Sequence, residues 1–226
     1  MIVELVPLAL LGGVLGLDVV SFPQAMISRP IVAATLAGGL MGQAPSGMLI
    51  GAALELIALE TLPFGASRYP EWGSASVVGG AIFATHPTHP AGAMTVGMLA
   101  ALATTWIGGW TMVKLRQLNA HWAARWRKGL EAGSRGTVTT LQLTGMTADL
   151  VRGVLLTAIA YALLAPLANA CIGLWSMDAR LSRALVVTTA ASVAGGAAWK
   201  LFHSTAGARW FFIGGLGIGL FVLFAQ

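Results

Sequence analysis

The sequence predicts an all-α integral membrane protein, a multi-span helical bundle with re-entrant or broken helices in its N-terminal half. Hydrophobic residues make up 57% of the 226 positions, charged residues make up only 9%, and the mean hydropathy is +0.80. A soluble domain carries about 25% charged residues. The uncharged runs 91–113, 153–177, 184–199 and 210–226 are close to the roughly 17 to 25 residues that cross about 30 Å of hydrocarbon. Together these observations disfavour a soluble protein with a large core.

The N-terminal segment, residues 1–20, is predicted to be the first membrane segment. It is apolar but has neither the basic leader nor the small-residue cleavage site of a secretory signal. We therefore expect it to be retained as part of the bundle.

Glycine and proline interrupt the apolar N-terminal half at three places. The first break, QAPSG at 43–47, divides the uncharged run 30–54 into two pieces that are too short to cross a bilayer comfortably. The second break is LPFG at 62–65, and the third is HPTHP at 86–90. Discontinuous helices are tolerated at membrane depth where they line a cavity, and transporters bind their substrates and ions at such places. The breaks therefore indicate a solute path.

Residues 114–147 form the long polar stretch of the chain, and we expect a basic cytoplasmic loop here between the two halves of a single domain, 1–226. The bases of its first part are Lys114, Arg116, Arg125, Arg127, Lys128 and Arg135, against one acid, Glu131. A basic segment beside a transmembrane helix is retained in the cytoplasm. Trp122 and Trp126 lie at helical spacing with these bases, which indicates a short amphipathic helix on the inner membrane surface.

The second half is more regular, with candidate spans near 150–175, 183–200 and 210–226 separated by short charged connections. Nucleic-acid binding would use the same basic and aromatic composition as the polar stretch, but one small patch in a membrane protein does not favour it. We expect no nucleic-acid partner. Cys171 is the single cysteine, so an internal disulfide and a cysteine-based metal site are both excluded.

Glu55 is a candidate substrate-binding residue because it interrupts an otherwise apolar helix. Small residues at 47, 51 and 52 precede it on a helical face that another helix can approach closely. A carboxylate accepts hydrogen bonds from two hydroxyl groups, which suits a neutral sugar or polyol. The alternative is a structural ion pair with Arg29 or Arg68, or a helix cap. Acids within membrane segments mark functional sites by default.

Glu71 is the second candidate, because Arg68 and two aromatic residues, Tyr69 and Trp72, crowd the same turn. Proteins often bind sugars with polar groups on the hydroxyls and an aromatic ring against the C–H surface. The alternative is an interfacial loop whose Tyr and Trp lie in the headgroup belt.

Asp18 and Gln24 flank a possible helix break at Pro23. Each of them is either a cavity residue or a solvated loop side chain. The predicted substrate-binding set is therefore Asp18, Gln24, Arg29, Glu55, Arg68 and Glu71.

No catalytic, cofactor or metal site is expected. His86 and His89 have the spacing of a metal pair, but no third ligand is evident nearby and a loop between two spans explains them as well. Nucleophile elbows, a G-x-x-x-x-G-K-[ST] loop and H-E-x-x-H are missing from the sequence. We therefore expect a chain that is not catalytic alone and receives no phosphoryl group.

Several segments together carry a resemblance to a known family. They are SRPIVAATL at 28–36, GAALEL at 51–56, GASRYPE at 65–71, Ala-Ser at 75–76 and, more weakly, the stretch 203–219. These segments resemble the IIC membrane subunit of the mannose-family sugar phosphotransferase systems, which include mannose, fructose, sorbose and N-acetylgalactosamine systems. On this pattern Glu55 corresponds to the family's G-x-x-x-E glutamate, and Glu71 stands where an aspartate is common.

The resemblance implies a function and a set of partners. The IIC subunit and a IID subunit together form the sugar-translocating unit in the bacterial cytoplasmic (inner) membrane. Soluble IIA and IIB phosphocarrier proteins relay phosphate from phosphoenolpyruvate to the sugar, a hexose or amino sugar, as it is delivered inside. Family members are thought to work as trimers of IIC and IID pairs with an elevator-like movement.

Two other classes remain open from the residues themselves. An ion-coupled secondary transporter of a small polar solute would explain the broken helices equally well. A non-transporting membrane receptor or scaffold would bind a partner but move no sugar. Neighbouring genes for IIA, IIB and IID proteins would favour the phosphotransferase interpretation.

Overall fold

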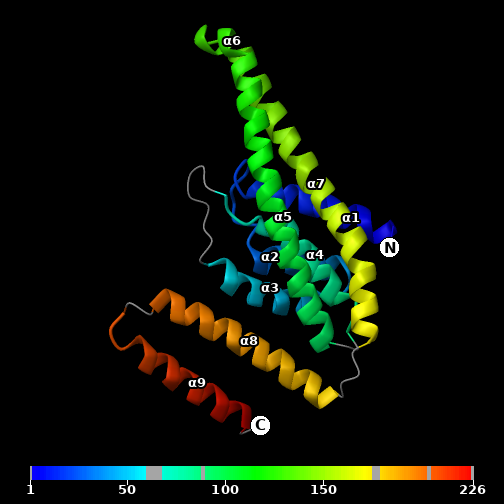
Figure 1. The fold of residues 1–226 in the computed structure, drawn as a ribbon, viewed down its shortest axis with the longest axis vertical. Helices are drawn as coiled ribbons and strands as arrows, with labels where there is room; N and C mark the ends of the chain where they lie inside the picture. Colours follow the sequence, from blue (N-terminus) through cyan, green and yellow to red (C-terminus); the bar gives the residue numbers. More distant parts are fainter. Residues whose placement is uncertain (1, 60–67, 88–89, 175–178, 203–204, 225–226) are drawn as a thin grey trace.

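The computed structural model describes residues 2–59, 68–87, 90–174, 179–202 and 205–224, and within these ranges the regular elements are all helices. The helices are α1 (Ile2–Asp18), α2 (Pro30–Leu40), α3 (Ala44–Ala58), α4 (Trp72–Ala84), α5 (Pro90–Arg125), α6 (Arg127–Glu131), α7 (Arg135–Gly173), α8 (Ala179–Phe202) and α9 (Ala208–Phe224). Figure 1 shows α5 and α7 as a long antiparallel pair that ends at α6, with α1 to α4 around its lower part. Helices α8 and α9 lie side by side at the end of the molecule far from α6.

The membrane character of the fold is evident on the outer face of α7. Val151, Leu155, Ile159, Leu163 and Leu167 are each exposed and lie four residues apart, so they form one apolar stripe. Such a stripe on a soluble monomer would be an aggregation site. By length and composition both α5 and α7 can cross a bilayer. The predicted fold class, an all-α membrane protein, is confirmed.

The first predicted break is confirmed as the turn between α2 and α3. Gly42 occupies the turn with a positive φ of 74°, a conformation that costs glycine little. Helices α2 and α3 have 11 and 15 residues, about 17 and 23 Å, so neither crosses 30 Å of hydrocarbon by itself. A Cβ on Gly47 would lie 2.2 Å from the Ala34 carbonyl oxygen, so the two backbones touch. The expected close approach along the small face of α3 is thereby confirmed.

Helix α4 is the centre of the bundle. Each residue from Trp72 to Ala84 is buried, which is possible because the helix carries no charge and every face meets another element. The helices packed around it are α1, α2, α3, α5 and α7. The third predicted break is confirmed, since α4 ends at Ala84 and α5 begins at Pro90. The second, at 62–65, lies outside the described residues.

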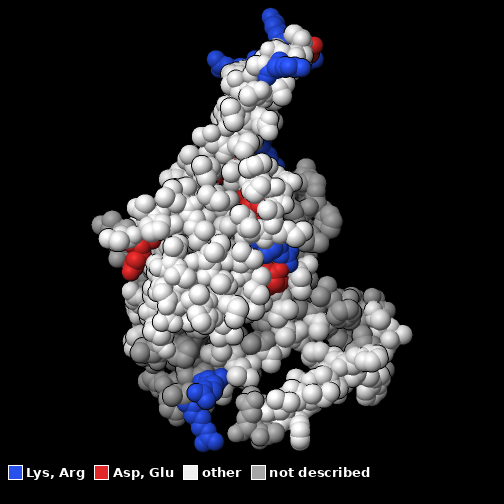
Figure 2. Space-filling model, turned by 180° about the vertical axis from the view of Figure 1, so that it is seen from behind, with Lys and Arg blue, Asp and Glu red and all other residues white. Residues whose placement is uncertain are grey.

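The polar stretch 114–147, expected as a connecting loop, is mostly helical. Its first part completes α5, its middle is α6, and its last part begins α7. The turn between α6 and α7 uses Gly133 with a positive φ of 64°, and Ser134 caps α7 by accepting a hydrogen bond from the Thr137 amide at 3.4 Å. The two halves are therefore joined by a helical hairpin. Its tip, residues 125–135, carries the gathered Lys and Arg side chains seen at one end of Figure 2.

Candidate functional site

Arg29 and Glu55 meet at the open end of the α2–α3 hairpin. Arg29 is the N-cap of α2, and Glu55 lies in the last turn of α3. Arg29 Nε donates to Glu55 Oε1 at 2.6 Å, Arg29 Nη2 contacts the same oxygen, and the Ile31 amide donates to Glu55 Oε2 at 3.2 Å. The antiparallel course of two short helices brings residues 26 positions apart into contact.

The structure has the ion pair between Arg29 and Glu55 that is the alternative interpretation of Glu55 in the sequence. The pair remains partly accessible, because 28% of the Arg29 side chain and 18% of the Glu55 side chain are exposed. Guanidinium N–H groups donate and carboxylate oxygens accept, so the pair presents both polarities at one point. A sugar hydroxyl, which donates and accepts together, is matched by that combination.

Asp18 holds the connection between α1 and α2. Its side chain is almost fully buried, with Oδ1 accepting from the Ala25 amide at 2.7 Å and Oδ2 from the Ser28 amide at 2.9 Å. Backbone amides just before Arg29 donate to both carboxylate oxygens. Asp18 therefore positions Arg29.

Gln24 and Arg68 lie at exposed positions. Gln24 Nε2 donates to the Val20 carbonyl at 2.6 Å within its own turn. Arg68 Nη2 donates to the Trp106 carbonyl at 3.1 Å, and its guanidinium lies 4.7 Å from the centre of the Trp106 ring, a cation–π contact. These two side chains therefore bind nearby backbone carbonyl groups. Of the predicted set, the structure brings only Arg29 and Glu55 into contact.

Glu71 is fully buried and caps the central helix. Its Oε1 accepts from the Ser74 amide at 3.1 Å, and its own backbone is bound twice by Thr105 of α5. Tyr69 and Trp72 are buried with it, at 6% and 8% exposure. These aromatic side chains are therefore covered by the bundle, and the Tyr69 ring lies 4.7 Å from the Arg116 guanidinium in a cation–π contact.

The structure reveals a second charged pair, Asp149 and Arg152 of α7, which the sequence pattern does not predict. Both are buried, with 0% and 8% of the side chain exposed. Arg152 Nε donates to Asp149 Oδ1 at 2.9 Å and Arg152 Nη1 donates to Thr111 Oγ1 at 3.4 Å, while Ser21 Oγ donates to Asp149 Oδ2 at 2.5 Å. The available signal was an acid and a base three residues apart on one helix at the edge of an apolar run. The predicted span near 150–175 includes Arg152, whereas Asp149 lies between that span and the polar stretch 114–147.

Glu71 and the Asp149–Arg152 pair form one buried charge cluster at the junction of α1, α4, α5 and α7. Glu71 interacts electrostatically with both residues of the pair. A Cβ on Gly16 of α1 would lie 3.1 Å from Ser74 Oγ and 3.4 Å from Arg152 Nη2, so that glycine clears space for the cluster. Two acids and one base give a formal charge of −1. Glu71 Oε2 is buried without a hydrogen-bond partner, which in a native core calls for water, a proton or a ligand, whereas Arg152 Nη2 lies 2.9 Å from Asp149 Oδ1 in the ion pair.

Of the two histidines with metal-pair spacing, the structure describes His86. His86 Nδ1 lies 2.9 Å from the Ile82 carbonyl oxygen at the end of α4, and His89 lies outside the described residues. Within the described ranges, no three His, Cys, Asp or Glu side chains are placed to hold a metal ion.

Fold and site together define a helical membrane protein with paired charges at a broken apolar helix, the class to which solute carriers belong. Residues 2–217 match the family described as the sorbose-specific IIC component of the PTS system, so the chain belongs to that family. It is a mannose-family phosphotransferase IIC component, a sugar transport protein of the membrane.

Solved structures share the fold at low sequence identity. One, described as the structure of a membrane protein, has a TM-score of 0.69 and 18% identity over 100% of this chain and 96% of its own. Another, the mannose transporter ManYZ in complex with microcin E492, has a TM-score of 0.62 and 17% identity over 97% of this chain and 87% of its own. The comparison with curated proteins gave no match.

Proposed function

We propose that this chain is the sugar-translocating IIC subunit of a phosphoenolpyruvate-dependent phosphotransferase system in the bacterial cytoplasmic membrane, and that it carries a hexose or amino sugar. The observation that carries the proposal is the partly exposed Arg29–Glu55 pair at the open end of two helices too short to span the bilayer. The family to which the chain belongs supports the same function.

In this proposal Arg29 and Glu55 contact the sugar directly. Glu55 accepts from one hydroxyl and Arg29 donates to the next, which replaces part of their mutual hydrogen bonding. Asp18 is a positioning residue, because both its oxygens bind the backbone that leads to Arg29. Gln24, Arg68 and Glu71 are left outside the contact set, since the first two bind local carbonyls and Glu71 caps a buried helix.

The proposed partners are a IID membrane subunit and soluble IIA and IIB phosphocarriers, with IIC and IID pairs assembled as trimers. Long exposed apolar faces, such as the α7 stripe, support a partner or lipid around the helices. We expect the chain to co-purify with a IID protein from mild detergent. Saturable sugar flux by this chain alone, at the rate of the full system, would contradict the subunit role.

The experiment that tests the proposal is sugar uptake into vesicles that contain this chain and IID, with IIA, IIB, the general phosphotransferase proteins and phosphoenolpyruvate supplied on the cytoplasmic side. We expect accumulation of sugar phosphate that requires phosphoenolpyruvate and continues in the presence of a protonophore. Uptake that is abolished by the protonophore and indifferent to phosphoenolpyruvate would identify an ion-coupled transporter instead.

A further inference from the structure

The hairpin tip combines charge, exposed aromatic surface and a fixed shape. Arg125, Arg127, Lys128 and Arg135 gather there against a single acid, Glu131, to which Arg127 Nε donates at 2.6 Å. The turn is fixed by hydrogen bonds from the Gly133 amide to the Leu130 carbonyl at 3.0 Å and from the Ser134 amide to the Gly129 carbonyl at 3.0 Å. A surface that is ordered beforehand loses less entropy when it binds.

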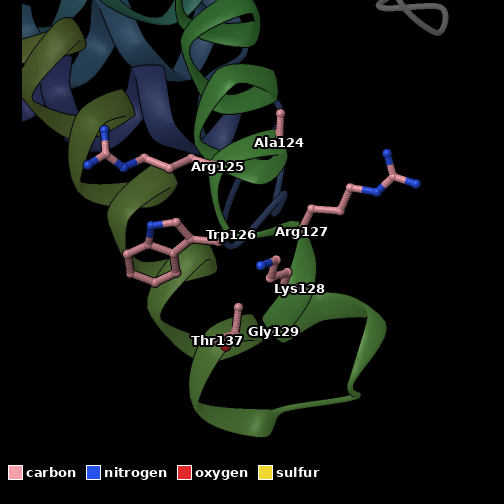
Figure 3. A pocket seen from close by; sticks show the side chains of 7 residues that line it. All are labelled: Ala124, Arg125, Trp126, Arg127, Lys128, Gly129 and Thr137. Carbon is pink, nitrogen blue, oxygen red and sulfur yellow. The ribbon is translucent and has the colours of Figure 1, made fainter.

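Two neighbouring hollows occur here, one at the tip and one beside it between α5 and α7, and Arg125 and Trp126 line both of them. The larger has a volume of about 500 Å³ and the smaller about 270 Å³. Figure 3 shows Arg125 and Trp126 pointing to the same side of the tip and Arg127 pointing away. Arg and Trp are the residue types that dominate protein–protein binding energies.

The register of the hairpin fixes where the tip stands relative to the membrane. Thr111 of α5 contacts Arg152 of α7, and Asn119 lies beside Gly145, so Lys114 is level with the residues around position 150. The apolar run of α5 ends at Lys114 and that of α7 begins near 150. Both helices therefore change from apolar to polar at one level, which marks the membrane boundary.

The tip stands well beyond that boundary. Trp126 follows Lys114 by 12 residues (126 − 114) along or just past one continuous helix, which is about 18 Å at 1.5 Å per residue. A tilt of about 40° would still leave about 14 Å. The headgroup layer is only about 5 to 8 Å thick. The basic tip thus extends into the aqueous phase and does not lie on the membrane surface as the pattern of Trp122 and Trp126 predicts, because α5 continues to Arg125 as one helix. A soluble protein therefore meets the tip more readily than lipid does.

We propose that the hairpin tip is a docking surface for the acidic face of a soluble protein, with Arg125 and Lys128 supplying charge and Trp126 supplying the apolar anchor. The inference rests on the proposed function, in which a IIB phosphocarrier must approach the membrane unit from the cytoplasm to phosphorylate the sugar. Complementary charge speeds such an encounter and makes it sensitive to salt.

The test uses the intact complex of this chain with IID in nanodiscs, and purified phospho-IIB of the same system as the probe. Sugar phosphorylation is measured as a function of IIB concentration for Arg125→Gln/Lys128→Gln and for Trp126→Ala. The matched controls are Arg180→Gln/Arg183→Gln at the start of α8, which removes the same charge far from the tip, and Trp110→Ala, an exposed Trp of α5. Melting temperatures confirm that each variant folds.

We expect the tip variants to raise KM for IIB about tenfold at low salt with kcat unchanged, and the effect of the charge variant to shrink in 0.5 M salt. The controls should match the wild type. An unchanged KM in the tip variants, with normal phosphorylation by the wild type, would overturn the docking surface and leave the proposed function standing. A KM effect that occurs only in discs of anionic lipid would assign the tip to the membrane and likewise overturn the inference. A wild-type complex that forms no sugar phosphate would overturn the proposed function itself and the inference with it.

Discussion

Arg29 and Glu55 join the first residue before α2 to the last turn of α3, with Arg29 Nε 2.6 Å from Glu55 Oε1. The contact closes the end of the hairpin opposite to the turn at Gly42. Neither side chain is fully buried, so the pair is both a clamp on two short helices and a polar surface that a solute can reach.

Glu55→Gln should weaken sugar binding more than folding. The change keeps the size of the side chain but removes charge-assisted hydrogen bonds worth about 1.5 to 3 kcal/mol, so affinity should fall roughly ten- to a hundredfold. The loss of a partly exposed ion pair costs only about 1 kcal/mol of stability. Both quantities are measured on the same purified complex with IID, by titration with sugar and by detergent melting.

Glu131→Gln is the matched control, because it breaks the exposed pair with Arg127 at the tip. It should leave sugar affinity unchanged. If Glu55→Gln leaves affinity intact but lowers the melting temperature strongly, the pair is purely structural.

Arg152→Gln should destabilise the protein severely. It leaves Glu71 and Asp149 buried without their base, and the loss of one partner from a buried charge pair costs about 3 to 5 kcal/mol. Asp149→Asn in the same chain should recover part of the loss, because coupled residues are not additive. Detergent melting of the two single variants and the double variant gives the coupling.

Arg127→Gln serves as the comparison for that measurement, since its partner Glu131 is mostly exposed and the pair is worth about 0.5 kcal/mol or less. Equal melting temperatures for Arg152→Gln and Arg127→Gln would show that the buried charge cluster does not stabilise the bundle.

Gly47→Ala should loosen the α2–α3 hairpin. The added Cβ would lie 2.2 Å from the Ala34 carbonyl oxygen, and forced overpacking of this kind costs about 1 to 3 kcal/mol. Gly39→Ala, in the facing helix, meets only Ala44 Cβ at 3.9 Å and should be neutral or slightly stabilising. Melting temperature and sugar affinity should fall together for Gly47→Ala, and a stable Gly47→Ala variant would contradict the backbone contact.

The hairpin tip should face the cytoplasm, because its bases are retained there. Cys171 is exposed and must first be replaced. In that background, Ala132→Cys should resist an impermeant thiol reagent in intact cells and react in inside-out vesicles. Leu174→Cys, at the opposite end of α7 and 85% exposed, should behave the other way round. Reaction of Ala132→Cys from outside would reverse the topology.

Much of the fold is readable from the sequence because the bilayer restricts it. Backbone groups in hydrocarbon need helical hydrogen bonds, so long uncharged runs predict α5 and α7, and a glycine–proline cluster predicts the α2–α3 turn at Gly42. The charges of the 114–147 stretch suit water and therefore predict a loop. A helix that leaves the membrane can be polar on all sides, and here α5 and α7 support each other well beyond the apolar runs.

The site was less readable, since it depends on which distant residues meet. The sequence predicts Glu55 as an acid within an apolar helix and offers two bases for it, Arg29 and Arg68. The spacing along the chain does not choose between Arg29 and Arg68; the close packing at Gly47 and Gly51 does, because it sets the register of α2 on α3. Asp149 and Arg152 sit at the end of an apolar run, and only the fold reveals that α1 and α4 cover them.

Helix α5 connects the core of the bundle to the hairpin tip as one continuous helix. It runs unbroken for 36 residues from Pro90 to Arg125, and on the way Gly108 lies directly against Glu71. A helix this long is stiff, so a small tilt of α5 at Gly108 displaces the tip. Each residue added between them would turn the tip by about 100°. The length of α5 therefore fixes which side of the tip faces a given side of the membrane core.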